Sequence, residues 1–172
     1  MTDQEKRIMI QAYYASISFI DEQVGKLIKK LDELKLKEST LIIFVSDHGF
    51  LLGEHDLWQK PNLFENTLRI PLIISDPRSA KAGLSSGSLI ELIDIYPTIL
   101  ELSDLEIPEY VSGKSFAALV DRPNTPFRQS ALSQSHARVT RPNLKKENIF
   151  GYSLRTEHFR YTEWAGGTHG TE

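Results

Sequence analysis

The sequence predicts an α/β fold, in which a mixed or parallel sheet is flanked by helices and followed by a small antiparallel sheet. A long amphipathic segment at residues 3–36 is typical of a helix. The unbroken apolar run at residues 41–45 is typical of a strand buried on both faces, as in a parallel sheet. Two prolines within residues 121–126 mark a change of architecture. We therefore expect an α/β part in residues 1–120 and a small, incomplete antiparallel β subdomain in residues 121–172.

The composition is that of an ordinary soluble globular protein, with 40% hydrophobic and 25% charged residues among 172. This length predicts one domain, or one domain with a small appendage. A net charge of −3 argues against nucleic acid or an anionic membrane as the main partner. No apolar run reaches the roughly 18 residues of a membrane span, and no signal peptide opens the chain. The absence of cysteine excludes disulfides and thiol chemistry without fixing the compartment.

The first predicted element is the helix at residues 3–36. Thr2 and Glu5 form a capping-box pattern at its start. We expect this helix to pack against the central sheet and to carry no chemistry. Apolar residues that recur every three or four positions give it one apolar face; they are Ile10, Tyr13, Ile17, Ile20, Val24, Leu27, Leu31 and Leu34.

Polar residues follow the predicted strand at residues 41–45 directly. In open α/β sheets the ligand crevice lies beyond the carboxyl ends of the strands, so Asp47 and His48 are the candidate site residues. Asp47 supplies the anionic oxygen that Ca²⁺ or Mg²⁺ prefers. His48 is either a second metal ligand or a partner of an anion that the metal holds. The four residues after the strand are Ser46, Asp47, His48 and Gly49.

A lysine follows His48 at a distance of twelve residues. The Lys60 ammonium is a compact charge that suits a tetrahedral oxyanion. A metal ion at Asp47 and the Lys60 ammonium, facing one pocket, would neutralise a sulfate or phosphate ester from two sides. The sequence therefore predicts one site in which these residues converge on an ester anion.

The remaining predicted elements are shorter. A second buried strand is expected at residues 70–75, and Asp94 is expected to cap a helix that runs to Leu102. Three strands are expected in the C-terminal part, and a tight turn at Glu157 and His158 joins the last two into a hairpin. These three strands are predicted at residues 130–135, 148–156 and 159–164.

Two motifs for other activities fail on their context. Residues 83–87 match the pattern G-x-S-x-G, but a turn-rich stretch stands where a nucleophile elbow needs a strand. The tripeptide at residues 113–115 matches the end of a Walker A loop, but Pro108 occupies the position that requires glycine. Neither a serine hydrolase nor a nucleotide-binding loop is expected.

At the motifs around Asp47 and Lys60 the chain resembles the type I sulfatases of the alkaline-phosphatase superfamily, and the iduronate-2-sulfatase-like branch most closely. The resemblance covers most of the chain and includes the Ser-Asp-His-Gly edge and the Gly-Glu-His-x-x-Trp-x-Lys loop. It implies an alkaline-phosphatase-like sheet flanked by helices, with a small C-terminal antiparallel sheet beside it. The matching segments are residues 12–27, 46–60, 69–73, 91–98, 151–156 and 159–162.

The resemblance implies a sulfuric-ester hydrolase that acts on sulfated sugars, with iduronate-2-sulfate-type groups as the substrate class. It makes Asp47 a ligand of Ca²⁺ or Mg²⁺, His48 a second metal-site residue with a catalytic role, and Lys60 a contact to the sulfate oxygens. The implied partners are a sulfated carbohydrate and the N-terminal remainder of the sulfatase, with no nucleic acid and no membrane. The segment itself does not reveal a compartment, but the family resemblance suggests export to the periplasm, the exterior or the lysosome.

The nucleophile of these sulfatases has no counterpart in the chain. The family converts a Cys, sometimes a Ser, in a Cys-x-Pro-Ser-Arg motif to formylglycine, whose hydrate attacks sulfur and expels the sugar alcohol. The chain contains no cysteine and no Ser-x-Pro-Ser-Arg. On this resemblance, formylglycine belongs to a missing N-terminal part, and the chain is a C-terminal fragment that should not turn over alone.

Two other function classes stay open. Phosphoryl chemistry, as in a phosphodiesterase or phosphonate hydrolase of the same superfamily, is one, because sulfate and phosphate are both tetrahedral oxyanions. A non-catalytic fragment that kept the fold and lost the reaction is the other. As a further hypothesis, His136 or Arg138 helps select an acidic sugar such as a uronate, since arginine suits bidentate contact with a carboxylate.

Overall fold

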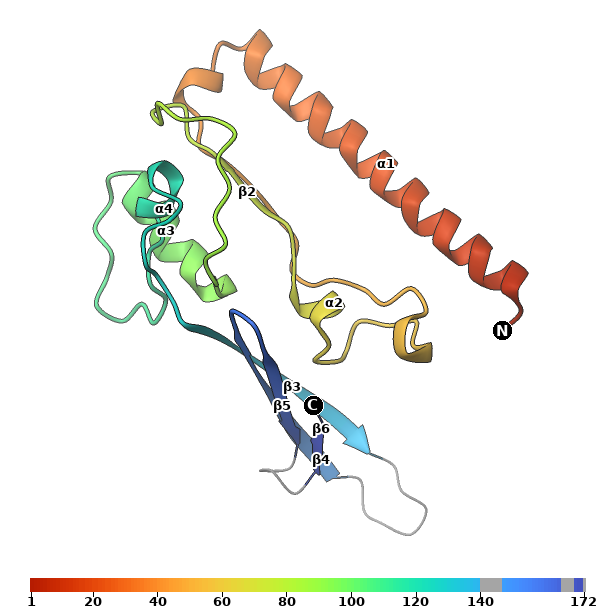
Figure 1. Ribbon diagram of the computed structural model, residues 1–172. Helices are drawn as coiled ribbons and strands as arrows, with labels where there is room; N and C mark the ends of the chain where they lie inside the picture. Colours follow the sequence, from red (N-terminus) through yellow and green to blue (C-terminus); the bar gives the residue numbers. More distant parts are fainter. Residues whose placement is uncertain (140–146, 165–168, 172) are drawn as a thin grey trace.

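The computed structural model of the chain describes residues 1–139, 147–164 and 169–171. Its elements form three regions that follow one another along the chain (Figure 1). A long helix comes first, a two-stranded sheet with short helices follows, and a four-stranded antiparallel sheet comes last. The chain therefore has a mixed α/β fold, as the sequence predicts.

Helix α1 (Asp3–Glu33) confirms the first predicted helix and its capping box. The Thr2 hydroxyl accepts a hydrogen bond from Glu5 N at 3.3 Å, and the Glu5 carboxylate accepts one from Thr2 N at 2.6 Å. These two bonds satisfy backbone donors that a helix start leaves unpaired. The helix ends a few residues before the expected position, because Lys35 adopts a left-handed conformation with φ 57°.

The apolar face of α1 meets solvent. None of the helix residues is buried, so the expected packing against the sheet is not seen among the described residues. Ile17, Ile20 and Leu27 each keep about half or more of their surface exposed, and α1 stands apart from β2 in Figure 1. One aromatic contact joins α1 to the rest of the chain: Tyr13 stacks on Phe50 with ring centroids 6.1 Å apart.

Across the residues that the structure describes, no helix combines the length and apolar character of a membrane span.

Strands β1 (Ile42–Val45) and β2 (Leu72–Ser75) pair antiparallel, with Val45 opposite Leu72. The expectation of a parallel strand buried on both faces is wrong for β1, since none of its residues is buried. An apolar run predicts a strand but not the direction of its partner. Here residues 46–71 lead the chain back along β1, and this return sets the antiparallel pairing. Pro71, which has no N–H to donate, stands just outside β2.

Short helical segments lie between the longer elements, and few hydrophobic residues are buried. The segments are η1 (Lys37–Ser39), η2 (Glu54–Asp56), α2 (Glu65–Leu68) and α4 (Ala118–Asp121). The core contains Phe116 and Leu119 at α4, and Phe127 lies edge-on to Phe116 with ring centroids 6.2 Å apart. Leu51 and Leu63, in the connection between β1 and β2, are also buried. These four aliphatic and aromatic side chains are the buried hydrophobic residues in the described ranges.

Asp94 is not the side-chain cap that the sequence predicts. It ends η3 (Leu92–Asp94), which leads directly into α3 (Ile95–Leu102), and its carboxylate is fully buried. That carboxylate accepts hydrogen bonds from Lys114 N at 2.8 Å, Glu91 N at 3.0 Å and Arg128 Nε at 2.9 Å. Burial raises the pKa of Asp94, but the Arg128 guanidinium and the two backbone donors outweigh burial and hold that pKa below its usual value.

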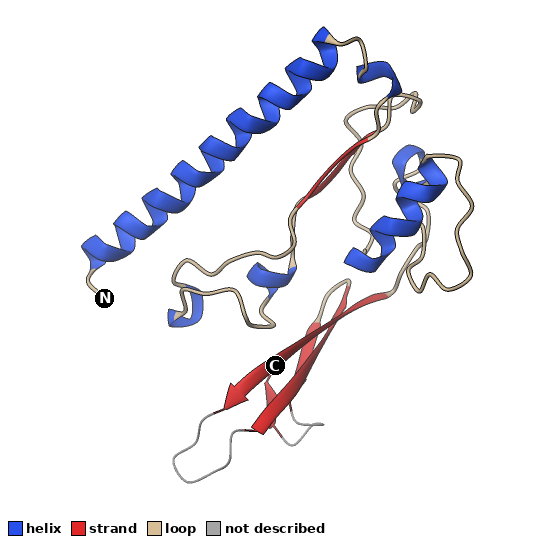
Figure 2. Cartoon of the chain, turned by 180° about the vertical axis from the view of Figure 1, so that it is seen from behind, coloured by secondary structure: helices blue, strands red, loops and turns tan. Residues whose placement is uncertain are grey.

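The C-terminal sheet confirms the predicted antiparallel strands (Figure 2). Its four strands pair in chain order, and the turn between β4 and β5 is closed by a hydrogen bond from Thr156 N to Phe159 O at 2.8 Å. The first strand is longer than expected and the fourth was not expected. The division of the chain at residue 121 stays a prediction. The strands are β3 (Ser130–Val139), β4 (Glu147–Thr156), β5 (Arg160–Trp164) and β6 (His169–Thr171).

The two rejected motifs lie in loops, as their sequence context indicates. Residues 83–87 have no strand directly before them and no helix directly after them. Gly113 has a packing role: a side chain there would collide with the carbonyl oxygen of Ile93, next to Asp94. This glycine is thus explained by close backbone approach and not by a phosphate.

Candidate functional site

Two hydrogen bonds and one close backbone approach shape the turn at the end of β1. Ser46 Oγ donates a hydrogen bond to His48 O at 2.8 Å, and Gly49 N donates one to Thr67 O at 2.8 Å. The backbone of Asn66 lies so close to Gly49 that any side chain at this position would collide with the Asn66 carbonyl oxygen. The turn therefore requires glycine for close approach, and α2 fixes the place at which His48 leaves the strand.

The three predicted site residues meet at the His48 imidazole. Lys60 Nζ lies 2.9 Å from His48 Nε2, and Asp47 Oδ2 lies 3.3 Å from the same nitrogen. The other ring nitrogen, Nδ1, lies 2.8 Å from Gly49 O. A carbonyl oxygen only accepts, so the hydrogen-bond network assigns the proton to Nδ1. In the neutral ring, Nε2 then has a lone pair that accepts from the Lys60 ammonium.

This arrangement is open to a ligand. The Asp47 side chain is 82% exposed and the His48 side chain 36% exposed. A carboxylate, an imidazole lone pair and an ammonium thus share one accessible surface. Asp47 and His48 offer two donor atoms that suit a divalent cation. Within residues 1–139, 147–164 and 169–171 no cluster of three or more His, Cys, Asp or Glu side chains adds further metal ligands.

The loop that carries Lys60 is folded on itself. Leu51 N donates to Gln59 O at 3.2 Å and Gly53 N donates to Leu57 O at 3.0 Å, which draws the two ends of the loop together. Gly53 has a φ of 113°, a conformation that favours glycine. This closure places Lys60 beside His48, although twelve residues separate them.

His55, which lies in the same loop, is turned toward a different neighbour. Its ring stacks on Phe64 with centroids 3.9 Å apart and an angle of 11° between the planes. His55 and the following Asp56 both have a positive φ, of 55° and 57°. Residues without glycine's freedom rarely adopt this conformation, so the surrounding contacts must hold it.

Sequence reasoning missed a second charged cluster beside the site. Glu65, the first residue of α2, accepts hydrogen bonds from Arg160 Nε at 2.8 Å and Arg160 Nη2 at 2.6 Å. Arg155 Nε lies 3.3 Å from the same carboxylate oxygen. Burial raises the pKa of Glu65, but Arg160 and Arg155 outweigh burial and hold that pKa below its usual value. In the sequence, the indication of this cluster is that each of the two arginines lies within a predicted strand.

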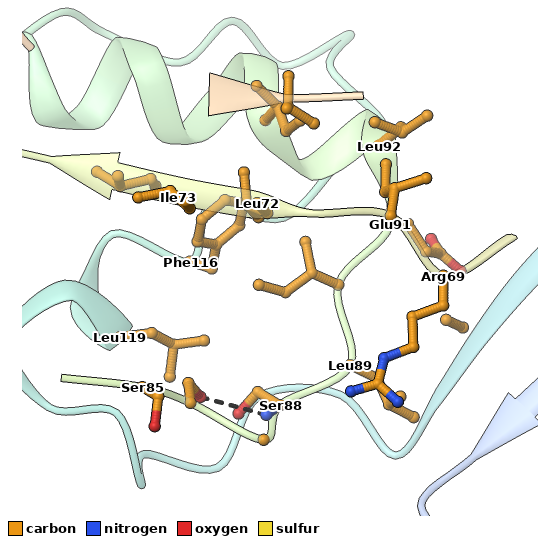
Figure 3. A pocket seen from close by; sticks show the side chains of 18 of the residues that line it. Arg69, Leu72, Ile73, Ser85, Ser88, Leu89, Glu91, Leu92, Phe116 and Leu119 are labelled. Atoms are coloured by element: carbon orange, nitrogen blue, oxygen red, sulfur yellow. Dashed lines mark hydrogen bonds between the residues drawn. The ribbon is translucent and has the colours of Figure 1, made fainter. Parts of the chain in front are cut away.

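A large open cavity adjoins the site. It has a volume of about 1240 Å³ and includes Asp47, His48 and Glu65, whereas Lys60 lies outside it. Figure 3 shows the part lined by Leu72, Phe116 and Leu119, where Arg69 extends toward the loop at Ser88. The lining of the cavity combines apolar side chains with polar and charged ones, among them Arg69, Glu91 and Arg155, so the cavity provides both room and further polar groups beside the charged site.

The two residues predicted to select an acidic sugar are in β3. His136 is exposed and lies opposite Phe150 of β4. Arg138 lies opposite Asn148, and its side chain falls outside the residues whose side chains the structure describes. No described contact joins either residue to Asp47, His48 or Lys60, so their role stays a hypothesis.

Comparisons of the sequence with a family model and with known proteins point to the same family. The sulfatase family model matches residues 1–105. Human iduronate 2-sulfatase is 32% identical over 212 residues, which cover 94% of this chain and 38% of that protein. The chain thus spans well under half of the length of this relative.

Solved structures of related proteins share the fold. A protein solved with its substrate D-glucosamine-2-N,6-O-disulfate aligns with a TM-score of 0.74 at 28% identity, over 88% of this chain and 32% of its own. A phosphonate monoester hydrolase from Silicibacter pomeroyi aligns with a TM-score of 0.73 at 28% identity, over 85% of this chain and 30% of its own.

Proposed function

Because this chain belongs to the sulfatase family, we propose that it contributes the cation and sulfate contacts of a sulfuric-ester hydrolase that acts on sulfated sugars. The observation that supports these roles most directly is the meeting of Asp47, His48 and Lys60 at one ring nitrogen. These residues combine the charges that a sulfate ester needs: donors for a divalent cation, and an ammonium for the anionic oxygens.

The proposed roles follow from the charge and the lone pairs of each group. The Asp47 carboxylate and His48 Nε2 are the groups that would hold Ca²⁺ or Mg²⁺. A bound cation would supply positive charge against the sulfate oxygens. The Nε2 lone pair serves one partner at a time, so a cation held at Nε2 would leave the Lys60 ammonium free of His48. Lys60 would then be available to donate hydrogen bonds to the sulfate oxygens.

The nucleophile is not among these residues. The formylglycine expected from the family has no precursor here, since the chain contains no cysteine and no Ser-x-Pro-Ser-Arg. We therefore expect these 172 residues to bind the anion without hydrolysing a sulfate ester. For the finer substrate class we propose iduronate-2-sulfate-type groups, with His136 or Arg138 contacting the sugar carboxylate. This rests on the similarity to human iduronate 2-sulfatase.

Sulfate titration of the chain tests the proposed site. We expect the NMR signals of Lys60 and His48 to move with added sulfate in the presence of Ca²⁺ or Mg²⁺. Lys60→Ala should weaken binding by about 100-fold or more, because it removes a charged donor to the oxyanion. Lys26→Ala is the matched control, since the described contacts of Lys26 are with Glu22 and Gln23 on α1. Equal sulfate binding by Lys60→Ala and the unaltered chain would overturn the assignment.

Phosphonate ester hydrolysis is the second candidate, and similarity to the phosphonate monoester hydrolase favours it. Metal and lysine alone do not separate the two esters, because both are tetrahedral oxyanions. The complete product of the gene should be assayed on a sulfated uronate, a sulfated glucosamine and a phosphonate monoester. Preference for the phosphonate ester by kcat/KM would replace the sulfatase assignment.

A further inference from the structure

We propose that Arg155 and Arg160 are positioning residues for the sulfate site, which they hold in shape through Glu65 and helix α2. The proposal rests on the proposed function, because it concerns the site made by His48 and Lys60. Neither arginine touches these two residues in any described contact. Their effect passes through the short helix between them.

Helix α2 is bonded to both segments of the site. Thr67 O accepts the hydrogen bond from Gly49 N that fixes the turn at His48. The Thr67 hydroxyl donates to Asn62 Oδ1 at 2.6 Å, and Asn62 N donates to Lys60 O at 2.8 Å. Thr67 is only 1% exposed, so these bonds are shielded from water. A shift of α2 therefore moves the His48 turn and the Lys60 segment together.

The helix does not hold itself in place. It has four residues, which is a single turn, and an isolated turn is unstable in water. No side-chain hydrogen bond caps its first residue. Its orientation must come from contacts with the rest of the chain, and Glu65 makes the charged ones.

The C-terminal hairpin presents its two arginines to Glu65 as a pair. Arg155 of β4 and Arg160 of β5 lie directly opposite each other in the ladder. Like charges in such positions repel each other unless an anion lies between them. Glu65 is that anion, and Arg160 is further held by a hydrogen bond from Nη1 to Ser153 Oγ at 2.9 Å. Ser153 is fully buried and also accepts from the Thr162 hydroxyl at 2.9 Å.

The two arginines are directed at Glu65. Arg155 and Arg160 also line the open cavity, and their side chains are 25% and 18% exposed. One nitrogen, Arg155 Nη1, is buried and has no hydrogen-bond partner among the described residues. The excess positive charge at this point acts on the Glu65 carboxylate, and through it on α2.

The first test measures sulfate affinity and site geometry in two variants of the chain. Glu65→Gln keeps the shape of the side chain and removes its charge. We expect it to weaken sulfate binding by about 10- to 100-fold, as loss of a supporting partner does at comparable sites. It should also displace the NMR signal of the His48 Cε1 atom in the absence of sulfate. Arg160→Lys keeps the positive charge but cannot donate both hydrogen bonds that Arg160 Nε and Nη2 give to Glu65. Its loss of sulfate affinity should therefore be smaller than that of Glu65→Gln.

Glu91→Gln is the matched control. Glu91 also pairs with an arginine, Arg128, and accepts a hydrogen bond from Leu132 N at the start of the C-terminal sheet. It has no described bond to α2. A general loss of stability would affect both variants, whereas loss of positioning affects sulfate binding and the His48 signal only in Glu65→Gln.

The outcomes separate the positioning role from the proposed function. Unchanged sulfate affinity and an unchanged His48 signal in folded Glu65→Gln and Arg160→Lys overturn the positioning role, whatever the melting temperatures. If the unaltered chain does not bind sulfate, the proposed function fails. The His48 signal and the proximity of Lys60 to His48 in Glu65→Gln still decide the positioning role in that case. If Glu65→Gln does not fold, Arg160→Lys supplies the same comparison.

Discussion

Lys60 Nζ and His48 Nε2 lie 2.9 Å apart, and the opposite ring nitrogen of His48 is already engaged by Gly49 O at 2.8 Å. The neutral imidazole therefore has one lone pair, at Nε2, and the Lys60 ammonium occupies it. A divalent cation at the proposed site would require the same lone pair. We therefore expect cation binding to displace Lys60 from Nε2.

Asp47→Asn should remove cation binding from the chain. Asn keeps an oxygen but loses the negative charge that a hard cation prefers. We expect added Ca²⁺ or Mg²⁺ to move the NMR signals of both Asp47 and Lys60 in the unaltered chain, since His48 releases the lysine when it binds the cation. With two protein ligands the affinity should be weak, about millimolar.

The control for this titration is Asp56→Asn, in the same loop but outside the described contacts of His48. A cation response that survives in Asp47→Asn, or that leaves Lys60 unmoved in the unaltered chain, would contradict the linkage.

Gly49→Ala should destabilise the chain, because its methyl group would collide with the carbonyl oxygen of Asn66. The cost of such overpacking is about 1–3 kcal/mol in the free energy of unfolding. Urea denaturation followed by circular dichroism measures it. Gly25→Ala is the matched control: nothing lies within 4 Å of its added methyl group, and alanine within a helix should stabilise by roughly 0.5–1 kcal/mol. Equal stability of Gly49→Ala and the unaltered chain would show that the turn tolerates a side chain.

Asp94→Asn should cost about 1–3 kcal/mol at neutral pH, because it removes the buried charge to which Arg128 donates, while Arg128 keeps its pair with Glu91. The pKa of Asp94 is lowered in the folded chain. Its charge therefore contributes stability fully above the unfolded value of about 3.9, and that contribution is lost as pH falls through the lower folded value.

The difference in unfolding free energy between Asp94→Asn and the unaltered chain should accordingly shrink as the pH is taken from 7 to 3. Urea denaturation at several pH values measures it. Asp104→Asn, which affects an exposed pair with Arg78, serves as the control and should cost about 1 kcal/mol or less. A cost for Asp94→Asn that is the same at every pH would show that its charge is not the stabilising feature.

The convergence of Asp47, His48 and Lys60 was predictable because it is local. A strand that ends in polar residues and a loop that returns within twelve positions confine the three side chains to one neighbourhood. The antiparallel strands near the C-terminus were predictable for a similar reason, since the turn at Glu157 and His158 is short. In both cases the sequence separation is small enough for pattern and turn chemistry to decide the contact.

The contacts that the sequence did not predict join distant positions. Glu65 meets Arg155 and Arg160 across 90 and 95 residues, and no periodicity connects such positions. Asp94 was assigned as a helix cap because an aspartate before a helix usually is one. Its burial depends on Arg128, which lies 34 residues further on. The direction of β2 relative to β1 also depends on the path between them and not on either strand.

The apolar face of α1 is exposed, so the stability of this helix depends on what covers that face. With no buried residue, α1 depends on local helix–coil balance more than on tertiary support. Its amide protons should therefore exchange with deuterium well before those of the C-terminal sheet. Any macromolecule that covers Ile17, Ile20 and Leu27 would slow that exchange along the whole helix, so protection of α1 would report the arrival of a partner directly.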